Sequence, residues 1–156
     1  MTNAVEITVS SVLAAPRQEV WARVTSQAGL DHEFRPVLRM RFPAPYRGGS
    51  IADLPVGEPV GRAWLLLGGV IPVDYDDLCL AEVEPGSHFL ERSRLGSARR
   101  WEHERRLEDV VGGSTRLTDR LSFEPRRGVP PAVSRALVGG FFGHRHRRLR
   151  AWFAAP

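Results

Sequence analysis

The sequence has no lysine, a single cysteine and no long apolar run. All 22 of its basic residues are arginine, a usage that we attribute to GC-rich coding rather than to nucleic-acid binding. The lone Cys79 excludes an internal disulfide or a multi-cysteine metal site, and we expect a buried structural thiol. No apolar stretch approaches the roughly 18 residues that a spanning helix requires, so we predict no membrane span.

Length and composition indicate one domain. A chain of 156 residues with a 42% hydrophobic content is typical of a globular protein with one core, and we expect residues 1–156 to form a single domain. The start, "MTNAVEITVSS", lacks the basic and apolar parts of a signal peptide, so we expect a cytoplasmic protein, either a monomer or a homodimer. No phosphate-binding glycine loop, nucleophile elbow or Cys-His pattern is present, so we expect neither cofactor nor metal.

The first third of the chain predicts a strand, two short helices and a second strand. "VEITVSSVL" alternates apolar and polar residues as a half-buried strand does. Pro16 suits the first turn of a helix over "AAPRQEVWARVTS", and "SQAGLDHEF" predicts a second short helix or turn before the strand "RPVLRMRF". Residues 43–61 are dense in proline and glycine, which predicts a long loop with one short strand near Ile51.

The remainder predicts an antiparallel meander and a long helix. Short Gly, Ser and Pro separators divide five strands: "RAWLLLGG", "VIPVDYDDLCLAEVE", "HFLERSRL", "RRWEHERRLED" and "TRLTDRLSFEP". "PPAVSRALVGGFFGHRHRRLRAWFAA" predicts a helix with Arg145 near the centre of its apolar face and His146 at the edge. This order predicts an α+β helix-grip fold, in which a curved antiparallel sheet of six to seven strands wraps around the C-terminal helix.

The chain resembles the SRPBCC superfamily, the START and birch-pollen-allergen-like group that includes polyketide cyclases and dehydrases. The stretch "ITVSSVLAAPRQEVWARVTSQAGL" carries its Ala-Pro-x-x-x-Val-Trp pattern. "WEHERRL", "RLTDRLSF" and "FGHRHRRLR" resemble an uncharacterised bacterial branch, in which a second histidine often stands where this chain has Arg105. The resemblance implies a cavity between sheet and helix that binds a small hydrophobic or amphipathic molecule.

Alternation along the later strands places ionisable groups in that cavity. If the faces with the larger apolar residues are concave, the strand beginning at Arg99 turns Trp101, His103, Arg105 and Leu107 inward. Extending this reasoning to the other strands and the final helix gives the predicted ligand-binding set: Glu91, Trp101, His103, Arg105, Asp119, Leu121, Phe141, Phe142 and Arg145.

Two interpretations of the inward charges are open. Isolated buried charges cost several kcal/mol, so these groups should pair with one another or with a ligand. A structural ion-pair network would join, for instance, Asp119 with Arg145. Alternatively, an arginine of this set would anchor the polar or anionic end of an otherwise apolar ligand.

Three functions compete. The first is a binding module for a small hydrophobic or amphipathic molecule, and the second is a cyclase or dehydratase in which His103, Asp119, Arg145 or Tyr75 would act as acid, base or carbonyl-orienting group. The third is a protein-interaction module. The basic "HRHRRLR" suits a helix C-terminus through the helix dipole, so we expect no nucleic-acid partner. Alternation splits the acids of "DYDD" over two faces, and we expect them to be solvated rather than to bind a metal.

Overall fold

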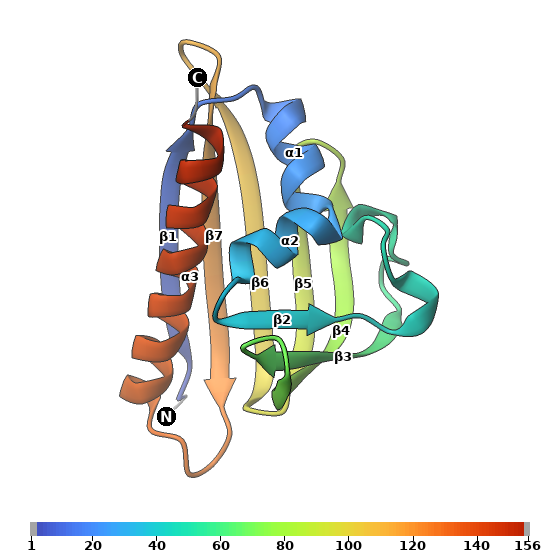
Figure 1. The fold of residues 1–156 in the computed structure, drawn as a ribbon. Coiled ribbons are helices and arrows are strands. Elements are labelled where there is room, and N and C mark those ends of the chain that lie inside the picture. Colours follow the sequence, from blue (N-terminus) through green and yellow to red (C-terminus); the bar gives the residue numbers. More distant parts are fainter. Residues whose placement is uncertain (1–2, 155–156) are drawn as a thin grey trace.

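A seven-stranded antiparallel sheet curls around one long helix in the computed structural model, which describes residues 3–154 (Figure 1). The strand order is β1-β7-β6-β5-β4-β3-β2, so the chain forms a meander from β2 to β7 and β1 pairs with the last strand. The elements are β1 (Val5–Leu13), α1 (Arg17–Thr25), α2 (Gln27–Phe34), β2 (Leu38–Arg41), β3 (Pro59–Leu67), β4 (Ile71–Glu84), β5 (His88–Leu95), β6 (Ala98–Val110), β7 (Ser114–Pro125) and α3 (Pro131–Phe153). The predicted α+β helix-grip architecture is confirmed.

The helices cover the concave side of the sheet. α3 runs along β1 and β7, while α1 and α2 cross the opening above the middle strands (Figure 1). Ser26 separates the two short helices, and its hydroxyl accepts a hydrogen bond from the amide of Gly29 at 3.0 Å, which caps the start of α2. Within residues 3–154 no helix is both long and apolar enough to cross a membrane.

The segment from residue 43 to 61 differs from its prediction. No strand forms near Ile51; instead, two short 3-10 helices occupy Ala44–Tyr46 and Ile51–Asp53, and Ser50 makes only one isolated bridge, to Ser26. The prolines and glycines of this stretch favour such turns, because they cannot sustain the regular ladder of a strand.

The strand beginning at Ala98 turns its faces as predicted. Trp101, His103, Arg105 and Leu107 are buried, with the Arg105 side chain fully enclosed. The residues between them are partly exposed, and their charges pair across the outer face, for example Arg100 with Glu102 at 3.2 Å. The same alternation holds in β5 and β7, because a strand has a period of two and one of its faces packs on the core.

Strand β4 corrects two expectations. Leu78 and Leu80 point into the core, so Cys79 lies on the outer face and is only half-buried rather than buried. Asp76 shares the inward face and is 6% exposed, so the prediction that all acids of "DYDD" are solvated is wrong for this residue. The neighbouring Asp77 points outward and pairs with Arg62 at 2.9 Å.

Candidate functional site

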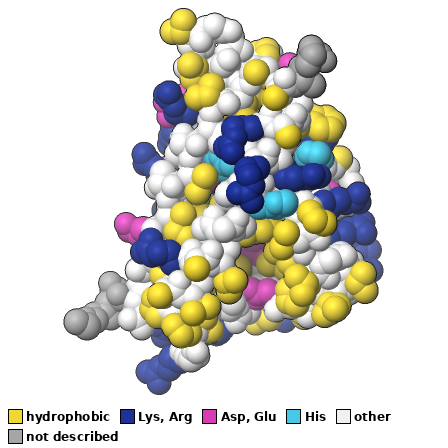
Figure 2. Space-filling view, turned by 60° about the vertical axis from the view of Figure 1, so that its left-hand side comes forward, with side chains coloured by type: hydrophobic (Ala, Val, Ile, Leu, Met, Phe, Trp, Pro, Cys, Tyr) yellow, Lys and Arg dark blue, Asp and Glu magenta, His cyan; other side chains and the backbone are white. Residues whose placement is uncertain are grey.

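A cavity of about 380 Å³ lies between the concave face of the sheet, α2 and α3. Its walls are mainly aliphatic and aromatic, and include Phe34, Met40, Leu80, Phe89 and Phe141. Figure 2 shows the depression beside α3, with hydrophobic side chains on both sides and an acidic group inside it. The volume falls within the roughly 300 to 1,000 Å³ of small-molecule sites.

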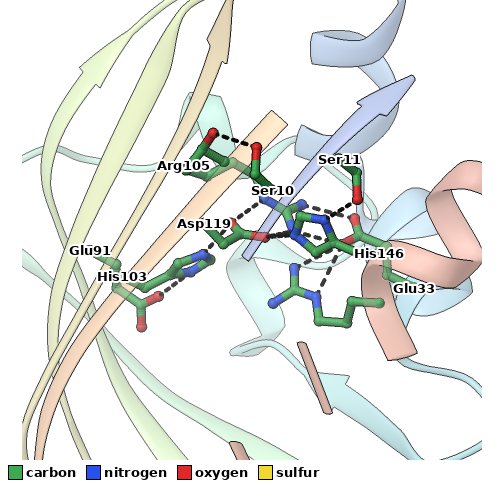
Figure 3. Close-up of polar contacts among 10 residues, drawn as sticks. Ser10, Ser11, Glu33, Glu91, His103, Arg105, Asp119 and His146 are labelled. Atoms are coloured by element: carbon green, nitrogen blue, oxygen red, sulfur yellow. Dashed lines mark hydrogen bonds and ion pairs between the residues drawn. The ribbon is translucent and has the colours of Figure 1, made fainter. Parts of the chain in front are cut away.

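Behind one wall of this cavity lies a buried polar network centred on Asp119 of β7 (Figure 3). Arg105 directly opposes it on β6 and donates two parallel hydrogen bonds of 2.8 Å. The Nε2 atoms of His103 and His146 each lie 2.7 Å from a different oxygen of the same carboxylate. Because an ionised carboxylate only accepts hydrogen bonds, both histidines donate from Nε2.

A second buried carboxylate, Glu33 of α2, completes the charge balance. It accepts a hydrogen bond from Nη1 of Arg105 at 3.1 Å and one from Nε of Arg145 at 3.0 Å. Its Oε1 also forms ion pairs with the Nη2 atoms of Arg105 and Arg145, at 2.9 and 3.0 Å. The guanidinium of Arg145 also lies over the rings of Phe34 and Phe142, 4.8 and 4.6 Å from their centroids. Two guanidiniums and two carboxylates therefore neutralise one another, and they tie α2 and α3 to the sheet.

The electrostatics of Asp119 follow from this packing. Burial by itself raises the pKa of a carboxyl group, but the charge and hydrogen bonds of Arg105, together with His103, hold the pKa of Asp119 well below its ordinary value. Burial likewise opposes the charge of Arg105, yet Asp119 and Glu33 raise its pKa above the ordinary value. Asp119 and Arg105 are therefore both charged.

The predicted pairing of Asp119 with Arg145 is wrong. Asp119 pairs with Arg105 because the two are direct cross-strand neighbours, whereas Arg145 reaches Glu33 on the adjacent helix. Sequence reasoning missed Glu33, although its position three residues after Leu30 and next to Phe34 is that of an inward-facing helical residue.

His146 is also more central than expected. It was predicted at the edge of the apolar face of the helix, but it is 1% exposed. Its Nδ1 lies 2.7 Å from the Ser11 hydroxyl, which also accepts from Arg150 at 2.8 Å. The serine can thus donate to Nδ1, which fits a neutral His146 protonated at Nε2.

The remaining predicted site residues divide by position. Those that line the cavity are Glu91, Trp101, His103, Phe141, Phe142 and Arg145. Arg105, Asp119 and Leu121 are buried in the sheet wall and do not line it. Tyr75 lies on the outer face, where Arg62 stacks 3.7 Å from the centre of its ring, so its hydroxyl does not face the cavity.

Two further carboxyl groups, Asp76 of β4 and Glu91 of β5, are neighbours in the cavity wall. Burial and then the adjacent Glu91 charge raise the pKa of Asp76 well above its ordinary value. Burial also opposes ionisation of Glu91, but His103 and Asp76 outweigh it and lower the pKa of Glu91. Of the two adjacent carboxyl groups, Asp76 is therefore the one that binds a proton more readily.

The polar partners of this pair are incomplete. Asp76 Oδ1 and Glu91 Oε1 are buried without a hydrogen-bond acceptor or donor among the described residues. Nδ1 of His103 lies 3.8 Å from Glu91 Oε2, which is longer than a hydrogen bond. Within residues 3–154 no group of three acidic, histidine or cysteine side chains is arranged to hold a metal ion.

The curled sheet, the long helix and the cavity between them define a helix-grip fold. Solved structures of this fold superimpose on nearly the whole chain. A protein from Chromobacterium violaceum matches with a TM-score of 0.73 and 16% identity, covering 97% of this chain and 99% of its own. A START superfamily protein from Mycobacterium smegmatis matches with a TM-score of 0.69 and 14% identity, covering 96% and 97%.

The Zhui aromatase/cyclase from a Streptomyces species is similar at a TM-score of 0.71 and 13% identity, covering 97% of this chain and 94% of its own. Likenesses at this level of identity show the fold, which is that of the SRPBCC superfamily, as the sequence resemblance predicts. The chain belongs to the family described as a domain of unknown function, DUF8410, whose model matches residues 11–153. No curated protein matches the sequence.

Proposed function

We propose that the chain binds a small, largely apolar molecule in the cavity between sheet and α3. The observation that carries this proposal is the cavity itself, because a concave site of about 380 Å³ with mainly apolar walls favours the transfer of an apolar molecule from water into it. The START-like and aromatase/cyclase neighbours support a function of this kind. The competing hypothesis, a protein-interaction module, does not require a cavity beside His103.

The buried ion pairs act as scaffold in this proposal. Arg105 and Asp119 are fully buried and pair with each other, and Glu33 binds the remaining N–H groups of Arg105. Such a network holds α2 and α3 at a fixed distance from the sheet, so the cavity is pre-formed. Binding a ligand then costs little conformational entropy of the protein.

Blocking the cavity tests the proposal. Val138 lines it from α3, whereas Val133 on the same helix is 48% exposed and does not line it. We expect Val138→Trp to abolish binding of an apolar fluorescent probe and of any molecule that co-purifies with the protein in native mass spectrometry, while Val133→Trp leaves both unchanged. Equal binding by wild type and folded Val138→Trp would overturn the proposal.

A cyclase-type activity is the second candidate, and the orientation of His103 favours it. Asp119 fixes the ring through Nε2 and leaves Nδ1 on the side of Glu91 and the cavity. A carboxylate that orients an imidazole in this way supports acid or base catalysis. Mass analysis of a bound polyketide-like probe after incubation tests this candidate, because turnover should be lost in His103→Gln and unchanged turnover would remove His103 from the reaction.

A further inference from the structure

The ionisable groups that line the cavity are mostly acidic. Asp74, Asp76 and Glu91 contribute carboxyl groups, whereas Arg145 contributes the one guanidinium and His103 an imidazole among the described lining residues. An anionic ligand would therefore meet more like charge than opposite charge, which opposes its binding in a site of low dielectric.

The guanidinium of Arg145 already pairs with a carboxylate of the protein. Its Nε and Nη2 bind Glu33, and aromatic rings lie close to it. Arg105 lies outside the cavity and is paired to Asp119 and Glu33. The charge of each arginine is therefore already balanced by a carboxylate, which weakens its attraction for a carboxylate or phosphate group of a ligand.

The carboxyl groups differ in how far they are satisfied. Asp74 accepts from the backbone amides of Tyr75 and Ser97 at 2.8 and 3.0 Å and from the Ser97 hydroxyl. Asp76 and Glu91, in contrast, are 6% and 8% exposed, and each has a buried oxygen without a partner. A buried unpaired acceptor is costly, so this pair is the part of the cavity wall that a ligand can stabilise most.

Resting on the proposed function, we infer that the cavity selects an apolar molecule bearing a protonated amine, whose ammonium group lies between Asp76 and Glu91. An ammonium has several N–H donors and can reach both carboxyl groups, and its charge offsets the cost of ionising both. The proton held by Asp76 leaves to solvent when the amine binds. The aromatic walls accommodate the apolar body of the ligand.

Other ionisable groups around the pair shape this preference. Asp74 adds negative charge from β4, while His103 on β6 and Arg145 on α3 oppose the ammonium when charged. The pairing of Arg145 with Glu33 cancels much of its field, since the two groups are 3.0 Å apart. Because amine binding expels a proton from Asp76, amine affinity should rise with pH as long as the amine itself stays protonated.

Three probes with one aromatic body test the inference. Naphthylmethylamine, naphthylmethanol and naphthoic acid would be titrated by calorimetry into the wild-type protein at pH 7. We expect the amine to bind about tenfold tighter than the alcohol, and the acid to bind most weakly. In the double variant Asp76→Asn/Glu91→Gln the amine should fall to the affinity of the alcohol, while Asp77→Asn on the outer face leaves the order unchanged.

The outcomes separate the two proposals. If the alcohol binds but the amine binds no tighter, or if the double variant keeps the amine preference, the amine inference is overturned and cavity binding stands. If none of the three probes binds, both proposals are overturned. If the double variant does not fold by circular dichroism, the wild-type order of the three probes decides, because it needs no substitution.

Discussion

At the scale of single residues, one carboxylate organises the interior. Asp119 has no exposed surface and accepts hydrogen bonds from Arg105, His103 and His146. If the carboxylate were removed, the Nε2 atoms of both histidines would lose their acceptor and Arg105 would keep only Glu33 as a partner. Uncompensated buried charges are among the largest single-residue effects on stability.

We therefore expect Asp119→Asn to lower the free energy of unfolding by about 3 to 5 kcal/mol, since it breaks a buried pair and leaves Arg105 partly uncompensated. Denaturant unfolding followed by circular dichroism measures this loss. Asp77→Asn, which removes an exposed pair with Arg62, is the matched control and should change stability by less than about 1 kcal/mol. Similar stabilities for the two variants would contradict the structural role of Asp119.

Asp76 should make stability depend on pH in the opposite sense to Asp119. Its pKa is raised in the folded state, so between the ordinary value of about 4 and the folded value the folded protein binds more protons than the unfolded chain. Stability therefore falls as pH rises through this window. The lowered pKa of Asp119 instead contributes stability above about pH 4 that is lost on acidification.

The difference in unfolding free energy between Asp76→Asn and wild type isolates this effect. We expect the variant to gain stability relative to wild type as pH rises from 4 to 7, because asparagine does not ionise and can donate to Glu91. Urea unfolding at several pH values measures the trend, with Asp77→Asn as a flat reference. A constant difference across that range would show that Asp76 is not protonated in the folded state.

At the scale of elements, Glu33 joins three parts of the fold. It belongs to α2 and binds Arg105 of β6 and Arg145 of α3, so one side chain spans both helices and the sheet. A second contact joins the same helices, from Arg148 to the backbone oxygen of His32 at 2.9 Å. α2 has only eight residues, so these tertiary contacts rather than its own propensity hold it in place.

Glu33→Gln should therefore destabilise the protein by about 3 kcal/mol and loosen α2, because a neutral amide cannot balance two buried guanidiniums. Hydrogen exchange measured by mass spectrometry should show faster exchange in α2 than in β6 or β7. Glu19→Gln on the exposed side of α1 is the matched control, with an expected change within about 0.5 kcal/mol. Unaltered exchange in α2 would argue against the bridging role.

At the scale of the whole molecule, three apolar clusters surround the polar network and the cavity. One lies between α1, β7 and the end of α3, the second under α2 and β2 to β5, and the third around Trp101 and Phe142. The charge pairs cross between these clusters, so loss of one cluster removes partners from the others. We propose that residues 1–156 act as a single cooperative domain.

Coincident unfolding transitions test this proposal. Tryptophans lie in different places, with Trp101 in the core and Trp64 41% exposed on the outer face, so tryptophan fluorescence and far-ultraviolet circular dichroism probe different parts of the chain. We expect the two signals to give the same midpoint and slope in urea. Separate midpoints would divide the chain into independent units.

Strand faces and element order were within reach of sequence reasoning. The period of two in β6 predicted that His103 and Arg105 face inward, and the final apolar stripe predicted the helix that the sheet grips. The partners of the buried polar groups were harder to predict, because they lie far apart in the sequence: Arg105 is 72 residues from Glu33 and 14 from Asp119. Alternation split the acids of "DYDD" over two faces, but it did not show that the face of Asp76 is the one that packs on the core.

The amino-acid sequence by itself determined the architecture, since apolar periodicity, prolines and short turns are local signals that act wherever the chain passes. Only the tertiary structure decided which charges meet. Asp119 pairs with its cross-strand neighbour Arg105 rather than with Arg145, and Asp76 lies beside Glu91 in the cavity wall. Sheet curvature and helix placement set the distances between these charged groups. Pairing energies in a buried site depend on such distances, and no local pattern encodes them.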